Sequence, residues 1–229
     1  MPAHFTWSHF ISQVSHELYH AVYAGLCGFI FLILAFLGEK ALNKKKAYIP
    51  EGKFNIKAFF ELFVEQIAQL SDSIVGEKGR PMLPLFCFFF LFIWIQNLLG
   101  LIPGFLPPSQ NLNSTLALGL LSFLAYNYYG LREHGWAYFK QFIGPVVYLA
   151  PLFVFIEVLS HFFRAVSLGF RLFGNMSGDH IVIGIFLDMA PFLIPVIFYF
   201  LGLFVCTLQA FVFTILSMVY VSLAISHDH

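Results

Sequence analysis

Two apolar segments near the end of the chain are too long to cross a membrane upright, and this length strongly constrains the fold. They cover residues 142–187 and 190–225, with firm punctuation between them only at residues 188–191. As one helix, the first segment would be roughly 69 Å long at 1.5 Å per residue, whereas the hydrocarbon core of a bilayer is only about 30 Å thick. Such helices have to tilt strongly or bend.

The first of these segments allows two interpretations. It is either one long helix, which its glycines and prolines allow to bend, or two separate spans that are broken near residues 163–165. The stretch 163–165 holds no glycine, proline, asparagine or aspartate, and these are the residues that usually form turns. We therefore expect one long, strongly tilted helix.

Composition places the whole chain in a membrane. Of its 229 residues, 59% are hydrophobic and only 10% are charged, against about 25% charged residues in soluble domains. The apolar runs are long and helical rather than alternating as in a β-barrel. The sequence therefore predicts an all-α integral membrane protein with one membrane domain over residues 1–229. Residues 1–141 would hold N-terminal helices, and residues 142–229 a long helical hairpin.

Four further helices are predicted before the hairpin. Apolar runs at about residues 19–37, 82–101 and 112–131 are long enough to span a bilayer. At residues 55–72, apolar side chains recur at helical spacing with glutamates and glutamines opposite them. This pattern is typical of an amphipathic helix on the membrane surface. We expect about five membrane-crossing helices and one surface helix.

The basic residues predict the orientation of the chain. Ten of the twelve lysines and arginines follow the first or the third predicted span, and none precedes Lys40. Because basic loops stay on the cytoplasmic side, we expect the N-terminus outside and the C-terminus in the cytoplasm. The basic residues form no binding stripe, so membrane lipid is an expected partner and nucleic acid is not.

Arg171 lies in the middle of the first long apolar segment. Its guanidinium stays charged at any physiological pH, and holding it inside hydrocarbon costs roughly 2.5 to 3.5 kcal/mol on insertion scales. A membrane chain that keeps such a residue is expected to use the fixed charge to handle another charge. Ion movement is therefore the first functional hypothesis.

Polar residues share one side of the same predicted helix. Steps of three and four residues, which mark one helical face, connect Glu157, His161, Arg164, Leu168, Arg171, Asn175 and Asp179. This spacing predicts a titratable, hydrated seam, with Ser160 and His180 close to it. An alternative is that Glu157 and Arg164 merely pair with each other, which leaves Arg171 unexplained.

Two features beside Arg171 have two interpretations each. Gly174 and Gly178 allow a neighbouring helix to approach closely, either as simple packing or because the facing helix belongs to the partner on which the charge acts. Gln209 is the strongly polar side chain of the last segment. It either holds two helices together or orients Arg171.

Catalysis by this chain alone is not expected. The sequence contains no phosphate-binding glycine-rich loop, metal cluster or nucleophile motif, and its three cysteines lack metal-type spacing. We expect no cofactor and no bound metal. A stand-alone secondary transporter that binds an anion at Arg171 remains an alternative, although no internal repeat supports it. A structural membrane anchor would not need intramembrane charges.

Three stretches resemble one known family, the subunit a of F-type ATP synthases. Residues 167–176 read SLGFRLFGNM and fit the signature around that family's essential arginine. Residues 208–213 (LQAFVF) and 97–103 (NLLGLIP) support the likeness, which covers nearly the whole chain. The resemblance implies a non-catalytic, proton-translocating subunit of a bacterial inner membrane. Its partners would be a ring of c subunits and the b subunits of the peripheral stalk.

The resemblance also implies roles for individual residues. Arg171 would face the carboxylates of the c-ring between two offset half-channels, with Gln209 as its partner on the adjacent helix. Asn175 would belong to the water-filled path beside the arginine. The cytoplasmic half-channel would hold Glu157, Ser160 and Arg164.

The opposite half-channel is less well defined because the chain departs from the family at two positions. Asn111 stands where many bacterial members have an aspartate, and Gly202 stands where some have a histidine. The resemblance implies a role for His180 in this path. With it, Asp179 and Asp188 are the candidates for the outer proton path.

Overall fold

The computed structural model describes residues 19–42, 56–102, 105, 107–135, 138, 150–189 and 193–225. Within these ranges all regular structure is helical, which confirms the all-α prediction. The elements are α1 (Tyr19–Leu42), α2 (Ile56–Ile74), η2 (Glu77–Met82), α3 (Leu83–Gly100), η3 (Pro108–Gln110), α4 (Leu112–His134), α6 (Ala150–Met189) and α7 (Leu193–Ile225).

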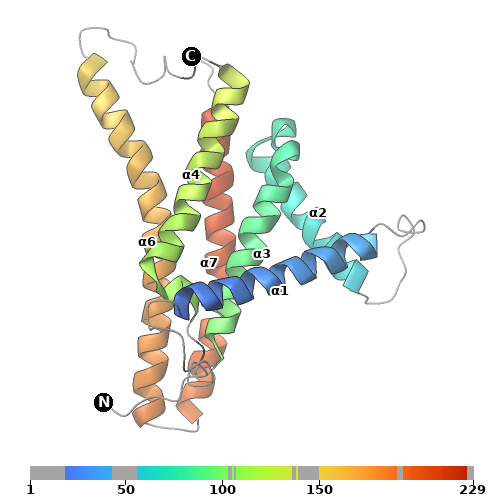
Figure 1. Cartoon of the computed structure of the whole chain (residues 1–229), viewed down its shortest axis with the longest axis vertical. Helices are drawn as coiled ribbons and strands as arrows, with labels where there is room; N and C mark the ends of the chain where they lie inside the picture. The colour runs from blue at the N-terminus through green and yellow to red at the C-terminus, as the bar shows by residue number, and fades with distance from the viewer. Residues whose placement is uncertain are drawn as a thin grey trace.

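α6 and α7 form the long antiparallel hairpin, with α4 packed against both and α3 packed against α7 (Figure 1). α6 has 40 residues and α7 has 33, which correspond to roughly 60 Å and 50 Å of helix. α6 continues without a break through residues 163–165, so the prediction of one long helix is confirmed. The expected start at residues 142–149 lies outside the described residues.

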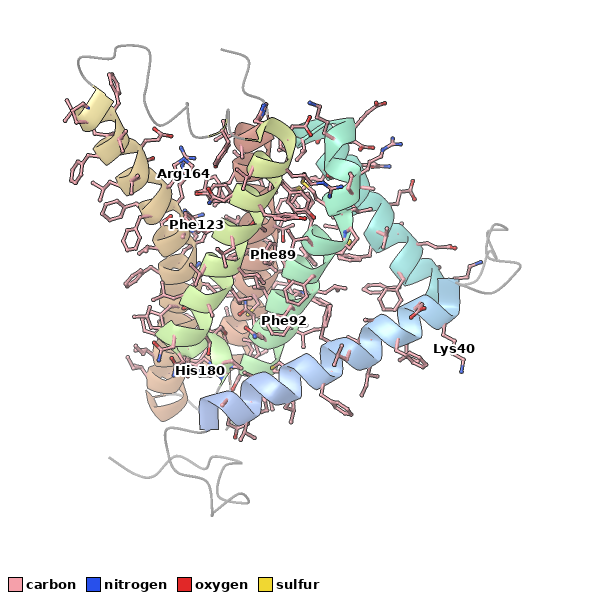
Figure 2. All side chains as sticks on the ribbon, turned by 45° about the horizontal axis from the view of Figure 1, so that its top comes forward. Lys40, Phe89, Phe92, Phe123, Arg164 and His180 are labelled. Atoms are coloured by element: carbon pink, nitrogen blue, oxygen red, sulfur yellow. The ribbon has the colours of Figure 1, made fainter. Side chains whose placement is uncertain are left out.

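α1 runs crosswise to α6 and α7, and α2 leads from the far end of α1 towards α3 (Figure 1). The crossing is filled by rings: the centroid of Phe31 on α1 lies 5.2 Å from that of Phe88 and 6.1 Å from that of Phe92 on α3. In Figure 2, Phe92 lies on the side of α3 that faces α1. The tilt of α6 and α7 in a bilayer stays a prediction from their lengths.

Four helical segments of the described chain are long and apolar enough to cross a membrane, and they comprise α1, η2 with α3, α6 and α7. α4 has 23 residues, which is sufficient length, but it is more polar than the others. Its polar side chains Ser122 and Tyr126 are buried and hydrogen-bonded to α7 and α6 rather than turned to lipid. The fifth crossing therefore stays a prediction.

The predicted surface helix exists as α2, and its apolar face is covered by protein. Phe60 and Ile67 are buried, while Phe63 and Leu70 pack against a core cluster that includes Phe86 of α3. The same cluster contains residues of α4 and α7, so α2 is tied to the rest of the bundle. Its position at a membrane surface stays a prediction.

A close backbone crossing between α4 and α6 sets how α6 is rotated. A Cβ atom on Gly119 would lie 2.4 Å from the carbonyl oxygen of Ala165, and one on Gly169 would lie 3.0 Å from the carbonyl oxygen of Thr115. Only glycine permits this approach. With this side of α6 turned to α4, the positions on the other side of α6 face away from the bundle.

Candidate functional site

Arg171 lies on the outward face of α6. Its side chain is exposed, whereas its neighbours Leu168 and Leu172 are buried. Within the described residues Arg171 forms no hydrogen bond and no ion pair. The one-sided seam expected on α6 is thus divided: Arg171 and Asn175 are exposed, but His161 is buried. The guanidinium therefore faces away from the helices that the structure describes.

Gly174 and Gly178 continue this open face. A Cβ atom at either position would meet nothing within 4 Å, in contrast to the crowded Gly169. No helix from the described part of the chain therefore covers the two glycines. That a partner's helix lies against them stays a prediction.

Gln209 on α7 is joined to Asn175 on α6. The Asn175 amide nitrogen donates to Oε1 of Gln209 at 2.6 Å, and the Gln209 side chain is only 5% exposed. This bond fits the interpretation of Gln209 as a link between helices. The described residues show no hydrogen bond between Gln209 and Arg171, so that pairing stays a prediction.

A second polar group lies about 21 Å along α6 from Arg171, at Glu157. Its carboxylate oxygen Oε1 lies 3.2 Å from Nε2 of His161, and Nδ1 of that histidine lies 2.7 Å from the hydroxyl of Tyr126 on α4. In the described chain Glu157 pairs with His161 and not with Arg164. The alternative of a simple Glu157–Arg164 pair is therefore wrong.

Arg164 points from α6 towards the interior of the bundle (Figure 2). Its guanidinium carbon lies 5.8 Å from the centre of the Tyr220 ring on α7, a distance that permits a cation–π contact. Ser160 is half-buried on the same helix. The expected members of the cytoplasmic half-channel thus lie together at one end of α6.

His180 lies on the other side of Arg171, roughly 14 Å along α6, where α6 passes the end of α3 (Figure 2). Its ring nitrogen Nε2 is buried and has no hydrogen-bond partner among the described residues. Asp179 is half-buried beside it. Asp188 belongs to α6, but its side chain lies outside the described part of the structure.

The last turn of α3 and the following loop add polar groups that the sequence reasoning missed. Gln96, Asn97 and Ser109 are almost fully buried, and Oε1, Oδ1 and Oγ of these residues have no partner among the described residues. Two adjacent amides inside an apolar span were the available signal. Buried polar atoms without a protein partner are typical of sites that hold water.

Both departures from the family pattern have a local structural explanation. Asn111 caps α4, since its Oδ1 accepts a hydrogen bond of 2.9 Å from the backbone N–H of Asn113. A Cβ atom on Gly202 would lie 2.8 Å from the side chain of Leu101, which directly follows α3. A histidine at position 202 would therefore require Leu101 to move.

The arrangement places a fixed positive charge between two polar regions of one helix. The described residues contain no cluster of three side chains suited to a metal ion. The carboxylates, imidazoles, amides and hydroxyls present can exchange protons and bind water, and the arginine cannot lose its charge. The chemistry available to these side chains is therefore proton exchange and the binding of water, and two separate proton routes stay a prediction.

Comparison with known proteins points in the same direction. The family model described as "ATP synthase A chain" matches residues 21–222. A protein of Bdellovibrio bacteriovorus named "ATP synthase subunit a" is 45% identical over 227 residues, covering 98% of this chain and 99% of its own length. A protein of the same name from Geobacter sulfurreducens is 41% identical over 198 residues, covering 86% of this chain and 83% of its own.

Proposed function

This chain belongs to the ATP synthase A chain family, and we propose that it is the proton-translocating stator subunit of an F-type ATP synthase. It does not catalyse ATP formation itself. It provides two offset half-channels, and Arg171 works between them against the carboxylates of a rotating c-ring. Proton flow is thereby coupled to rotation and to ATP synthesis.

The observation that carries this proposal is the outward guanidinium of Arg171, which has no ion-pair partner among the described residues. It stands on an open face of α6 beside two uncovered glycines, Gly174 and Gly178. An exposed arginine beside these glycines would be costly against lipid, because its charge would lie in hydrocarbon. They suit a packed neighbour that carries negative charge, and a ring of carboxylate-bearing helices is such a neighbour.

The mechanism follows from charge and position. A carboxylic acid that arrives next to Arg171 is favoured in its ionised form, so it releases its proton into one half-channel. After passing the arginine, the carboxylate takes up a proton from the other half-channel and re-enters the lipid neutral. The fixed positive charge between the two routes also opposes direct leakage of protons.

The two routes are assigned to the two polar regions of α6. Glu157, Ser160 and Arg164 form the cytoplasmic half-channel, and His180, Asp179 and Asp188 belong to the outer one. Asn175 and Gln209 lie between them, beside the arginine. The unpartnered buried atoms of Asn97 and Ser109 support a hydrated outer route close to the end of α3.

The proposed setting is a bacterial inner membrane, with the N-terminus outside and the C-terminus in the cytoplasm. The expected partners are the c-ring, against the Arg171 face, and the b subunits of the peripheral stalk. Purification of the tagged chain from membranes tests this assembly. Recovery without a ring and stalk would favour the stand-alone transporter instead.

The substitution Arg171→Lys tests the mechanism. A lysine keeps the positive charge at first, but in a poorly hydrated site it can lose its proton, and it lacks the planar fork of arginine. We expect the assembled complex to lose ATP-driven proton pumping in inverted vesicles. Normal pumping by Arg171→Lys would overturn the proposed mechanism.

A further inference from the structure

His161 is held at both ring nitrogens in the interior of the bundle. The imidazole is 5% exposed and Tyr126 is 1% exposed. The two distances, 2.7 Å from Nδ1 to the Tyr126 hydroxyl and 3.2 Å from Nε2 to Glu157 Oε1, are those of hydrogen bonds. His161 thus connects a half-exposed carboxylate on α6 to a buried phenol on α4.

The chemistry of the two titratable partners is complementary. A glutamate has an ordinary pKa of about 4.3, so an isolated carboxylate carries a proton for only a small fraction of the time at neutral pH. A histidine has an ordinary pKa of about 6.5 and changes charge close to neutral pH. An imidazole bonded to the carboxylate can hold a proton when the carboxylate by itself cannot.

The nitrogen that can exchange a proton with Glu157 is Nε2, because it is the one that faces the carboxylate. When Nδ1 keeps its hydrogen and donates to the Tyr126 oxygen, Nε2 is left facing Glu157. The other titratable groups of this region are Tyr138 after α4, Arg164 on α6 and Tyr220 on α7. Arg164 lies over Tyr220 and not on Glu157, and the ion pair that the described residues show for this carboxylate is the one with His161.

We propose that His161 is a proton-relay residue that stores protons for Glu157 in the cytoplasmic half-channel. In the release step, the Nε2–H bond of the imidazolium breaks as an O–H bond forms on Oε1 of Glu157. This leaves a neutral imidazole and a carboxyl group. The carboxyl then gives its proton to water and becomes a carboxylate again, and the reverse steps reload the imidazole. The inference rests on the proposed function of the chain.

The substitution His161→Gln in the complete ATP synthase tests this role. Glutamine fills a similar volume and forms hydrogen bonds, but it cannot carry a proton. ATP-driven proton uptake by inverted vesicles is measured per assembled complex while the pH of the medium, which is the cytoplasmic side, is varied. We expect uptake roughly tenfold below wild type at pH 7 to 8. This factor is smaller than the rate enhancement of roughly 10²-fold or more that a positioned proton-transfer group typically contributes.

The deficit should depend on pH in a defined direction. As the pH falls towards about 5, the rising concentration of hydronium supplies protons without a store, so the ratio of variant to wild-type uptake should rise towards one. A histidine that only holds two helices together predicts a different result: less assembled complex, with normal uptake per complex. That result, or a deficit that is the same at every pH, would overturn the proposal.

Two further variants complete the test. His134→Gln is the matched control, because the Nε2–H of His134 donates to the Ile225 carbonyl 2.9 Å away, outside the proposed route; uptake per complex should stay normal. Tyr126→Phe removes only the hydroxyl that holds Nδ1 and should produce a smaller deficit in the same pH direction. If His161→Gln does not assemble, Tyr126→Phe decides, and an unchanged pH profile refutes the role.

Failure of this inference can be separated from failure of the proposed function. If Arg171→Ala abolishes pumping while His161→Gln behaves like wild type, only the proton store is refuted. If Arg171→Ala still pumps, the function assigned to the chain is refuted as well.

Discussion

Two glycines on α6, five residues apart, show opposite surroundings. Gly169 is pressed against α4, where an added Cβ atom would lie 3.0 Å from the Thr115 carbonyl, whereas Gly174 faces open space. Neither residue has a side chain, but within the described chain only Gly169 needs this in order to pack against a neighbouring helix. The difference shows that one face of α6 is packed within the described chain, whereas the other face is left open there.

The side chains around the two glycines follow the same division. Near Gly169, Leu168 is 2% exposed and Leu172 is fully buried. Arg171 and Asn175, near Gly174, are exposed. Changes on the packed face should therefore affect folding, and changes on the open face should affect coupling. The predictions below test that separation.

The largest effect is expected on the open face, from Arg171→Ala. Coupled proton pumping should fall to background, because no fixed charge remains between the half-channels. Thermal stability of the purified subunit complex should change by less than about 0.5 kcal/mol, as for other exposed substitutions. A large loss of stability would show that Arg171 serves the fold.

The next effect is expected on the packed face, from Gly119→Ala. The new Cβ atom would lie 2.4 Å from the Ala165 carbonyl oxygen, and overpacking of this kind costs about 1 to 3 kcal/mol. We expect less assembled complex and a lower midpoint of thermal unfolding.

Gly174→Ala is the matched control for this change. Alanine should leave the fold intact, or stabilise the helix by up to about 1 kcal/mol, while pumping falls if a partner helix packs there. Equal effects of Gly119→Ala and Gly174→Ala on unfolding would remove the distinction between the two faces.

A smaller effect is expected where the two faces meet, from Gln209→Leu. The substitution removes the bond to Asn175, a loss of about 1 kcal/mol, and also removes the buried Nε2 that has no partner in the described chain. Stability should therefore change little, whereas pumping should fall severalfold because Asn175 is no longer held. Thr214→Val, which removes only a bond to the carbonyl of Ala210 in the same helix, should leave pumping normal.

The smallest effect is expected away from both faces, at Glu133. Its hydrogen bond and charge interaction with Lys78, 2.6 Å away, lower the pKa of this exposed carboxyl below its usual value. The stabilisation from this ion pair exists above the pKa of about 4.3 that the carboxyl has in the unfolded chain. It is lost as the pH falls through the lowered pKa of the folded protein. Glu133→Gln should slightly reduce the unfolding temperature at pH 7, and the difference should shrink below about pH 4.

Much of the fold could be predicted because apolar length and turn residues are local signals. The absence of turn formers at residues 163–165 correctly indicated an unbroken α6. The predicted positions of the helix ends were less accurate. α1 continues to Leu42 rather than 37, since Glu39 and Lys40 are good helix formers. α4 continues to His134, where Gly135 with φ of 55° ends it.

The candidate site was only partly predictable, because sequence spacing gives the relative angle of residues on a helix but not its rotation in the bundle. That rotation depends on Gly119, which belongs to another helix. Consequently the seam was expected to be continuous, although the crossing buries His161 and Leu168 and exposes Arg171. The Tyr126–His161 bond likewise joins residues 35 positions apart, beyond any local pattern.

The low angle to the membrane that the length of α6 predicts would have a consequence for direction. On an upright helix, residues 23 positions apart such as Glu157 and His180 would differ by roughly 35 Å in depth. On a helix that lies nearly flat, most of that distance is lateral, along the rim of a neighbouring ring. In the proposed mechanism, a proton that enters near one residue and leaves near the other is carried around the rim by the rotating ring.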